Sequence, residues 1–294
     1  MRRTMIRLAG LVAAAGGMLA AASPAAAQGG CTRDMLQSLA DKYVEAQTAG
    51  QANIIPMGNW VVYRENFKLA SLSSDTLSKP LKVDWSRALL DTTACSVSLE
   101  MIITDDADPH TLAVQFRAFG GTGSNFSVIV AQPHDWLFDA KMTLAYAQRE
   151  DWSEIPEAQR NSREELQAAA DAYLDLFMDK DAEVPWGQPC NRLEGAVYTG
   201  KGVATDSCNV GVPANIAMVD RQYVIDPVLG AVDVQLKMGP NARPDSHRFR
   251  IEDGKIRYVH TITNCGEDLN CGFDPFPEML KRNPGMQPDP ALFD

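Results

Sequence analysis

The sequence lacks several features that would assign it to a familiar class. No apolar run after residue 22 is long enough to cross a membrane. The sequence has only 27 basic residues against 38 acidic ones, and the resulting net charge of −11 disfavours nucleic acid and anionic membranes as partners. With four histidines and no C-x-x-C or H-x-x-x-H spacing, no metal site is expected. Phosphate-binding loops, dinucleotide fingerprints and nucleophile elbows are also missing, so no cofactor is expected.

The first 27 residues have the pattern of a cleavable export signal. Three arginines within the first seven residues precede a small apolar stretch, and Ala25 and Ala27 fit the small-x-small cleavage pattern. The stretch is too short and too rich in Ala and Gly for a membrane anchor. We therefore expect a periplasmic or secreted protein, whose net charge changes from −11 to −14 when the three arginines are removed.

The six cysteines form an even set, which in an exported chain favours disulfides over buried free thiols. Six cysteines allow 15 pairings, so the connectivity is open in principle. Short spacing favours Cys190 with Cys208 and Cys265 with Cys271, and this leaves Cys31 for Cys95.

Two stretches of the chain look like copies of one unit. Helical periodicity predicts helices over residues 31–48 and 162–178. An apolar run between an Arg and an Asp follows each helix, ending at Asp91 and at Asp226. An Asp-x-His pattern then ends at His110 and at His247. The offsets between copies drift from 130 to 137 residues, as a duplication with small insertions would give; chance similarity of amphipathic segments is the alternative.

The predicted fold class is therefore α+β, as a tandem repeat. The expected organisation is a signal over residues 1–27, repeats over 28–155 and 156–272, and an extended Pro-rich tail over 273–294. The repeats are expected to pack as an internal pseudo-dimer, and the oligomeric state stays open beyond that.

Several segments resemble a known family. They include Val184-Pro-Trp-Gly-Gln-Pro-Cys190-Asn-Arg-Leu-Glu194-Gly, Cys208-Asn-Val-Gly-Val-Pro213, Asp220-Arg-Gln-Tyr-Val-Ile-Asp226, Ser246-His-Arg-Phe-Arg250 and Asp135-Trp-Leu-Phe138. The chain is similar to a secreted family of unknown function, shared by fungi and proteobacteria, with the nuclear-transport-factor-2-like (SnoaL-like) fold. The resemblance implies helices packed on a strongly bent antiparallel sheet around an apolar cone, with a His, Asp or Tyr inside it for proton transfer. Fold alone does not determine chemistry.

The clearest candidate site comes from a predicted hairpin. Asp253-Gly254 suits a two-residue turn, so residues whose numbers sum to 507 should pair across it. His247 then faces His260 on an apolar face, with Arg248 and Arg250 on the opposite, wetter face. Two close imidazoles would not both be protonated near neutral pH, so one could act as a general base. A structural pair bonded to a nearby carboxylate is the alternative.

Other candidates complete this predicted site. Tyr198 is the expected proton donor beside the two histidines. The expected substrate-binding residues are aromatic or charged side chains in the cone: Tyr63, Trp186, Arg192, Glu194, Tyr223 and Tyr258. Core packing and a structural salt bridge are the alternative roles for these residues.

The predicted function is that of an exported, cofactor-independent lyase, dehydratase or isomerase. It would act by general acid–base catalysis on a small hydroxylated, aromatic molecule, with lignin-derived compounds as one class. The alternatives are a periplasmic ligand-binding or accessory protein and an inert partner-binding module. An open pocket favours the first, and a filled cone the last. If the histidine pair is structural, the site is expected near Tyr63 and His134 instead.

Overall fold

The structure is a computed structural model that describes residues 31–274, 278 and 281–282. The signal expected in residues 1–27, and most of the expected tail, lie outside the described residues. The described residues belong to a single unit. Its first half contains α1 (Arg33–Ala49), β1 (Tyr63–Glu65), β2 (Lys68–Leu69), β3 (Trp85–Asp91), β4 (Ser96–Ile103), β5 (His110–Phe119) and β6 (Thr122–Ala131).

The second half repeats this order after an additional helix. It contains α2 (Ala140–Ala147), α3 (Arg163–Asp175), β7 (Trp186–Glu194), β8 (Val197–Tyr198), β9 (Met218–Asp226), β10 (Ala231–Met238), β11 (Arg243–Glu252) and β12 (Lys255–Thr263). Short 3₁₀ turns lie at η1 (Ala52–Ile54), η2 (Thr76–Ser78), η3 (Glu157–Gln159) and η4 (Leu269–Gly272).

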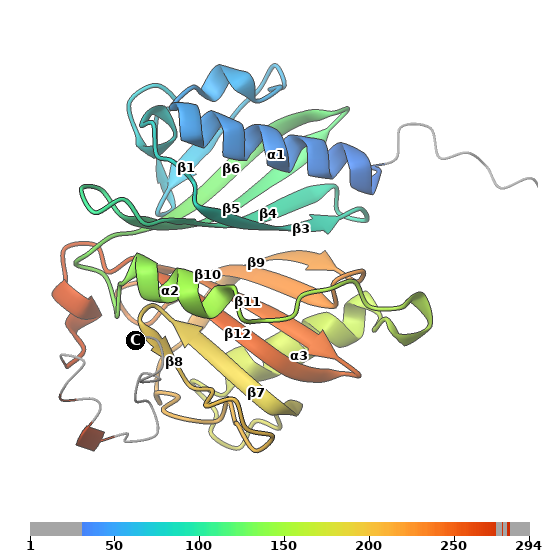
Figure 1. Cartoon of the computed structure of the whole chain (residues 1–294), viewed down its shortest axis with the longest axis vertical. Coiled ribbons are helices and arrows are strands. Elements are labelled where there is room, and N and C mark those ends of the chain that lie inside the picture. The colour runs from blue at the N-terminus through green and yellow to red at the C-terminus, as the bar shows by residue number, and fades with distance from the viewer. Residues whose placement is uncertain (1–30, 275–277, 279–280, 283–294) are drawn as a thin grey trace, which may run out of the picture. The chain divides into compact units, whose positions relative to one another are not determined.

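Both halves build the same six-stranded sheet. The strand orders are β2-β1-β6-β5-β4-β3 and β8-β7-β12-β11-β10-β9. Each sheet is antiparallel except for one parallel pair, β1 with β6 and β7 with β12. The prediction of an α+β fold with two similar units is therefore confirmed at the level of topology (Figure 1).

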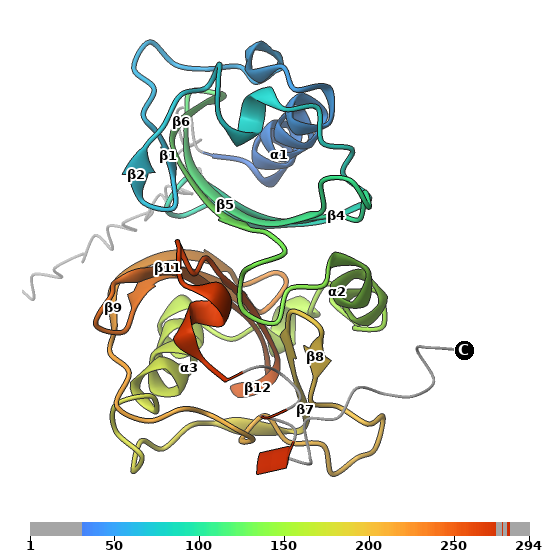
Figure 2. The same ribbon diagram turned by 90° about the vertical axis from the view of Figure 1, so that its left-hand side faces the viewer.

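Each sheet curves around one long helix of its own (Figure 2). The helix starts are set by side-chain caps, Thr32 for α1 and Ser162 for α3, where Glu165 completes a capping box. Tyr43 of α1 and Tyr173 of α3 are buried at equivalent positions, and each ring packs on aromatic residues of its own sheet. The two hydrophobic cores therefore lie between a helix and the concave face of a sheet.

The faces turned away from the helices carry polar side chains that bond to the other half. Gln115 Nε2 of β5 donates to Gln222 O of β9 at 3.1 Å. Arg248 Nη1 of β11 makes the matching bond to Arg87 O of β3 at 2.8 Å. Reciprocal contacts of this kind are typical of a two-fold interface, here between two halves of one chain.

Two buried aspartates reinforce the same symmetry. Asp91 at the end of β3 binds Arg163, the first residue of α3, with N–O distances of 2.7 and 2.9 Å. Asp226 at the end of β9 binds Arg33, the first residue of α1, at 2.7 Å. Each carboxylate also accepts a backbone N–H from the opposite edge strand. These residues serve the scaffold, and they tie each helix start to the other half.

Two details of the expected repeat are wrong. His110 pairs with Ile103 at the end of β4, whereas His247 pairs with Val234 within β10, so the two Asp-x-His patterns are not in equivalent register. Arg248 and Arg250 do not lie on a wetter face, because they are only 2% and 3% exposed. The sheet of the other half buries that face, which one repeat on its own would expose to solvent.

All six cysteines form the three expected disulfides, Cys31–Cys95, Cys190–Cys208 and Cys265–Cys271, and none is free. Peptide mapping of the protein without reduction should therefore recover these three linked pairs and no alkylated thiol. A labelled Cys190 in the folded protein would contradict this connectivity. Three disulfides are typical of proteins that mature in an oxidising compartment.

Within the described residues, none of the helices combines the length and apolar character needed for a membrane span.

Candidate functional site

The expected pairing of His247 with His260 is wrong. Near the turn the predicted register holds, with Ile251 opposite Ile256. A bulge then shifts the ladder, so that Arg248 pairs with His260 and His247 pairs with Thr261. Because a one-residue shift exchanges the faces, the two imidazoles point to opposite sides of the sheet.

His247 lines a cavity of about 280 Å³ on the helix side of the second sheet. Most of the surface of the cavity is apolar, but half of its lining residues carry polar or charged groups, among them His247, Glu194 and the Asp274–Arg282 ion pair. The lining residues are Trp136, Phe177, Glu194, Gly211, Pro213, Met238, His247, Thr261, Thr263, Phe273, Asp274 and Arg282. An apolar cavity with a few converging polar groups is the usual form of a small-molecule site.

The imidazole of His247 stands against a buried carboxylate. Its Nδ1 lies 2.8 Å from Oδ2 of Asp245, although neither atom has a hydrogen-bond partner of good angular geometry among the described residues. Oδ1 of the same carboxylate accepts the hydroxyl of Thr263 at 2.6 Å. A carboxylate this close to Nδ1 favours the imidazolium by its charge and leaves Nε2 for another partner.

Arg192 and Glu194 both lie on β7, and Glu194 lines the cavity. Arg192 Nη2 and Glu194 Oε2 are 2.6 Å apart, and Glu194 pairs in register with Thr261, next to His247. Burial lowers the pKa of Arg192, but Tyr173 and Glu194 outweigh it and raise the pKa overall. Burial raises the pKa of Tyr173 to about 12, so its hydroxyl stays protonated. The carboxylate at the cavity edge is therefore held in place by a permanent cation.

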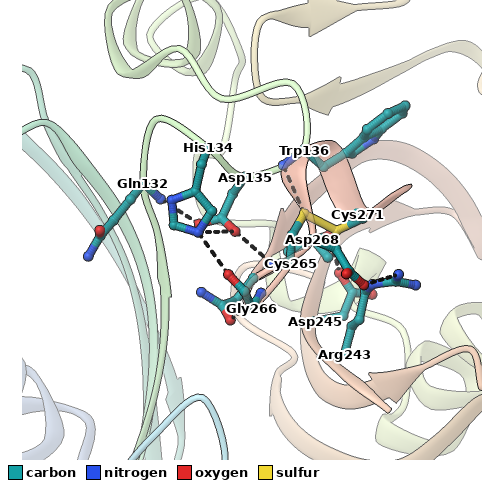
Figure 3. The surroundings of a disulfide bond; sticks show 12 residues. Gln132, His134, Asp135, Trp136, Arg243, Asp245, Cys265, Gly266, Asp268 and Cys271 are labelled. Carbon is teal, nitrogen blue, oxygen red and sulfur yellow. Dashed lines mark hydrogen bonds and ion pairs between the residues drawn. A yellow bond between two sulfur atoms is a disulfide. The ribbon is translucent and has the colours of Figure 1, made fainter. Parts of the chain in front are cut away.

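The cavity wall beside Trp136 is held by the third disulfide (Figure 3). Asp135 accepts the backbone N–H of Cys265 at 2.6 Å, and Trp136 N donates to the Cys265 sulfur at 3.2 Å. The Trp136 ring packs on Phe273 with centroids 4.6 Å apart, and its Nε1 donates to Glu194. The Cys265–Cys271 bond thus braces two aromatic walls of the cavity.

His260 lies on the other face, in a buried cluster between the two halves. Its Nδ1 is 2.8 Å from Glu100 Oε1, and its Nε2 is 2.6 Å from Glu150 Oε2. Burial alone would lower the pKa of His260, but Glu100 and Glu150 outweigh it and raise the pKa to about 9. The pKa of Glu100 falls to about 2, because His260 and Arg248 outweigh the effect of its burial. His260 is therefore a cation near neutral pH.

This cluster has no space for a substrate. The void beside Glu100 and His260 has no room for a water molecule. Tyr198 donates to Glu150 Oε1 at 3.2 Å, and Tyr258 stacks on Trp152 with centroids 5.9 Å apart. Two of the three expected catalytic residues, His260 and Tyr198, therefore lie together, but apart from the His247 cavity.

The remaining predicted site residues lie elsewhere. Tyr63 is in the first half, where its hydroxyl donates to Glu65. Tyr223 of β9 donates to Asp171 of α3, and Trp186 packs on Tyr173 with centroids 5.7 Å apart. These three side chains do not line the His247 cavity.

Two residues of these clusters were not predicted from the sequence: Trp136 at the His247 cavity and Glu150 beside His260. Both come from the segment between β6 and α3, which lies outside the repeated pattern of one helix and six strands. For Trp136, the signal in the sequence was its place in the segment Asp135-Trp-Leu-Phe138, which carried the family resemblance. A linker residue that fills a neighbouring core has no periodic pattern that could reveal it.

Among residues 31–274, 278 and 281–282, no group of three or more His, Cys, Asp or Glu side chains could hold a metal ion. A family model described as a domain of unknown function (DUF8021) matches residues 159–263, which include α3 and the second sheet. None of the curated proteins matches the chain. Nor does any solved structure. The match agrees with the expectation of a family of unknown function, and it places His247 and His260 in the matched region.

Proposed function

We propose that the protein is an exported, cofactor-independent lyase or dehydratase whose site is the His247 cavity. Each half is proposed to be a cone of the nuclear-transport-factor-2-like kind, and residues 1–27 the export signal. The observation that carries the proposal is His247 at the cavity wall, with Asp245 2.8 Å from its Nδ1. A cavity of about 280 Å³ with walls such as Trp136 and Phe273 suits a small flat molecule.

The proposed reaction is the loss of water from a β-hydroxy carbonyl compound. Nε2 of His247 takes the proton from the carbon beside the carbonyl, and the C–H electron pair forms the double bond. The C–O bond to the hydroxyl group breaks, and the imidazolium returns the same proton to the leaving oxygen, which departs as water. Asp245 stabilises the imidazolium between these two transfers. Glu194 and Thr261 line the cavity and are the proposed partners of the substrate hydroxyl.

The decisive variant is His247→Gln, tested on aromatic β-hydroxy carbonyl compounds by following the conjugated product in the ultraviolet. Loss of the general base should lower kcat by about 10²–10⁴-fold. Asp245→Asn should lower kcat with little change in KM, because the Asp245 carboxylate stabilises the imidazolium without touching substrate.

Two controls separate the His247 cavity from other candidates. His134→Gln makes the same chemical change at an exposed loop histidine and should keep full activity. Tyr198→Phe should also keep it, because that hydroxyl binds Glu150 in the closed cluster. If His247→Gln keeps full turnover, the catalytic proposal is wrong. Saturable binding without turnover, lost in His247→Gln, would instead identify a ligand-binding protein.

A further inference from the structure

A pseudo-two-fold axis relates the two ends of the contact between the sheets, and within the described part of the chain only one end is filled. At the filled end, residues 150–153 lie against the second half; they belong to the linker, the segment between β6 and α3. Glu150 binds His260 at 2.6 Å, and Arg250 Nη1 donates to Ser153 O at 2.8 Å. The Trp152 ring lies 4.3 Å from the guanidinium carbon of Arg87. The linker occurs once in the chain, so it can occupy one end only.

The opposite end is an open cleft of about 440 Å³. By strand register, Gln115 of β5 is the equivalent of Arg248 of β11. Ser127 pairs with Gln115 as His260 pairs with Arg248, so Ser127 is the equivalent of His260. Two residues further along each strand, Arg117 is the equivalent of Arg250. Both Ser127 and Arg117 line the cleft. Gln222, the equivalent of Arg87, also lines it. The cleft is therefore the counterpart of the space that residues 150–153 fill.

The chemistry of the open cleft is cationic and donor-rich. Among the residues that the structure describes, two arginines, Arg117 and Arg221, line it and no Asp or Glu does, in a chain of net charge −11. The hydroxyls of Ser96 and Ser127 are buried and have no hydrogen-bond partner among the described residues. Arg117 uses one N–H on Ala94 O and has further donors in its guanidinium. Arg221 is neutralised by Asp171 and Asp175, so Arg117 is the main cation here.

We propose that this cleft is a second binding site, for a small organic carboxylate. The carboxylate would take the place that Glu150 has at the filled end, with Ser127 and Ser96 as hydroxyl donors and Arg117 as the charged partner. A volume of about 440 Å³ is within the range of small-molecule sites. The site is separate from the His247 cavity, and its occupancy does not depend on the activity proposed there.

Calorimetric titration with two carboxylates, benzoate and glucuronate, against their neutral counterparts, benzyl alcohol and glucose, tests this site. At least one carboxylate should bind, and its neutral counterpart should bind at least tenfold more weakly. Arg117→Gln and Ser127→Ala should each weaken that carboxylate about tenfold, as expected for loss of a charge-assisted or buried hydrogen bond. Arg64→Gln, an exposed arginine on β1, is the matched control and should bind as the native protein does.

His247→Gln should also bind the carboxylate normally, so failure here and failure of the catalytic proposal are distinguishable. The proposal is overturned if neither carboxylate binds, if the neutral counterparts bind equally well, or if Arg117→Gln and Arg64→Gln behave alike. A capped Glu-Asp-Trp-Ser peptide has the sequence of residues 150–153, which fill the other end. If this peptide binds and neither benzoate nor glucuronate does, the proposal is also overturned, because the cleft would then be a peptide site.

Discussion

Asp91→Ala should destabilise the protein by about 3–5 kcal/mol, the range seen when one partner of a buried ion pair is removed. The Asp91 carboxylate is fully buried and binds both terminal nitrogens of Arg163. It also accepts backbone N–H groups of Thr93, Ala94 and Ile225. Truncation leaves these donors without their partner, and it loosens the turn after β3, the start of α3 and edge strand β9 together.

Urea unfolding followed by circular dichroism measures this effect, and the symmetry supplies a second case. Asp226→Ala should cost a similar amount, because Asp226 makes the reciprocal contacts with Arg33 and the Leu90 N–H. The matched control is Asp175→Ala, which removes an exposed carboxylate while Arg221 keeps its ion pair with Asp171, and it should cost less than about 1 kcal/mol. Equal effects of Asp91→Ala and Asp175→Ala would show that the contact of Asp91 with Arg163 and β9 does not hold the halves together.

The sequence predicts the repeated architecture well because its signals are local. Helical periodicity located α1 and α3 to within a few residues, because the expected ranges 31–48 and 162–178 overlap Arg33–Ala49 and Arg163–Asp175. The two Asp residues at the ends of β3 and β9 are equivalent in the structure as in the sequence. Cysteine spacing indicated the pairs in a chain whose six cysteines all form disulfides.

The candidate site is harder to predict, because it depends on one bulge and on one non-local surface. The Asp253-Gly254 turn fixes the register only as far as Ile251 and Ile256. Beyond the bulge His260 lies on the opposite face of the sheet from the predicted one, and no residue type near the bulge indicates the shift in register. A bulge also occurs in the equivalent β5–β6 hairpin, between Gln115 and Arg117. The face that receives His260 is buried by the other half, which a pattern read along one strand cannot show.

The buried position of His260 gives the protein a specific dependence of stability on pH. Its pKa is about 9 in the folded protein against 6.5 for the free side chain, so the imidazolium stabilises the fold fully below about pH 6.5. This contribution is lost as pH rises through about 9. At about 1.4 kcal/mol per pKa unit, it amounts to about 3 kcal/mol. Glu100 acts in the opposite sense, because its lowered pKa gives stability above about pH 4.5 that is lost towards pH 2.

His260→Gln isolates the alkaline part of this dependence. At pH 6 the variant should be less stable than the native protein by about 3–5 kcal/mol, because Glu100 and Glu150 then face each other without the cation. At pH 9.5 the native protein has lost much of the same contribution, so the difference should shrink by about 3 kcal/mol. Urea unfolding at both pH values measures the two differences, with His134→Gln, an exposed histidine, expected to follow the native protein throughout. A native stability that stays level from pH 6.5 to 9.5, with His260→Gln parallel to it, would mean that His260 is not a buried cation.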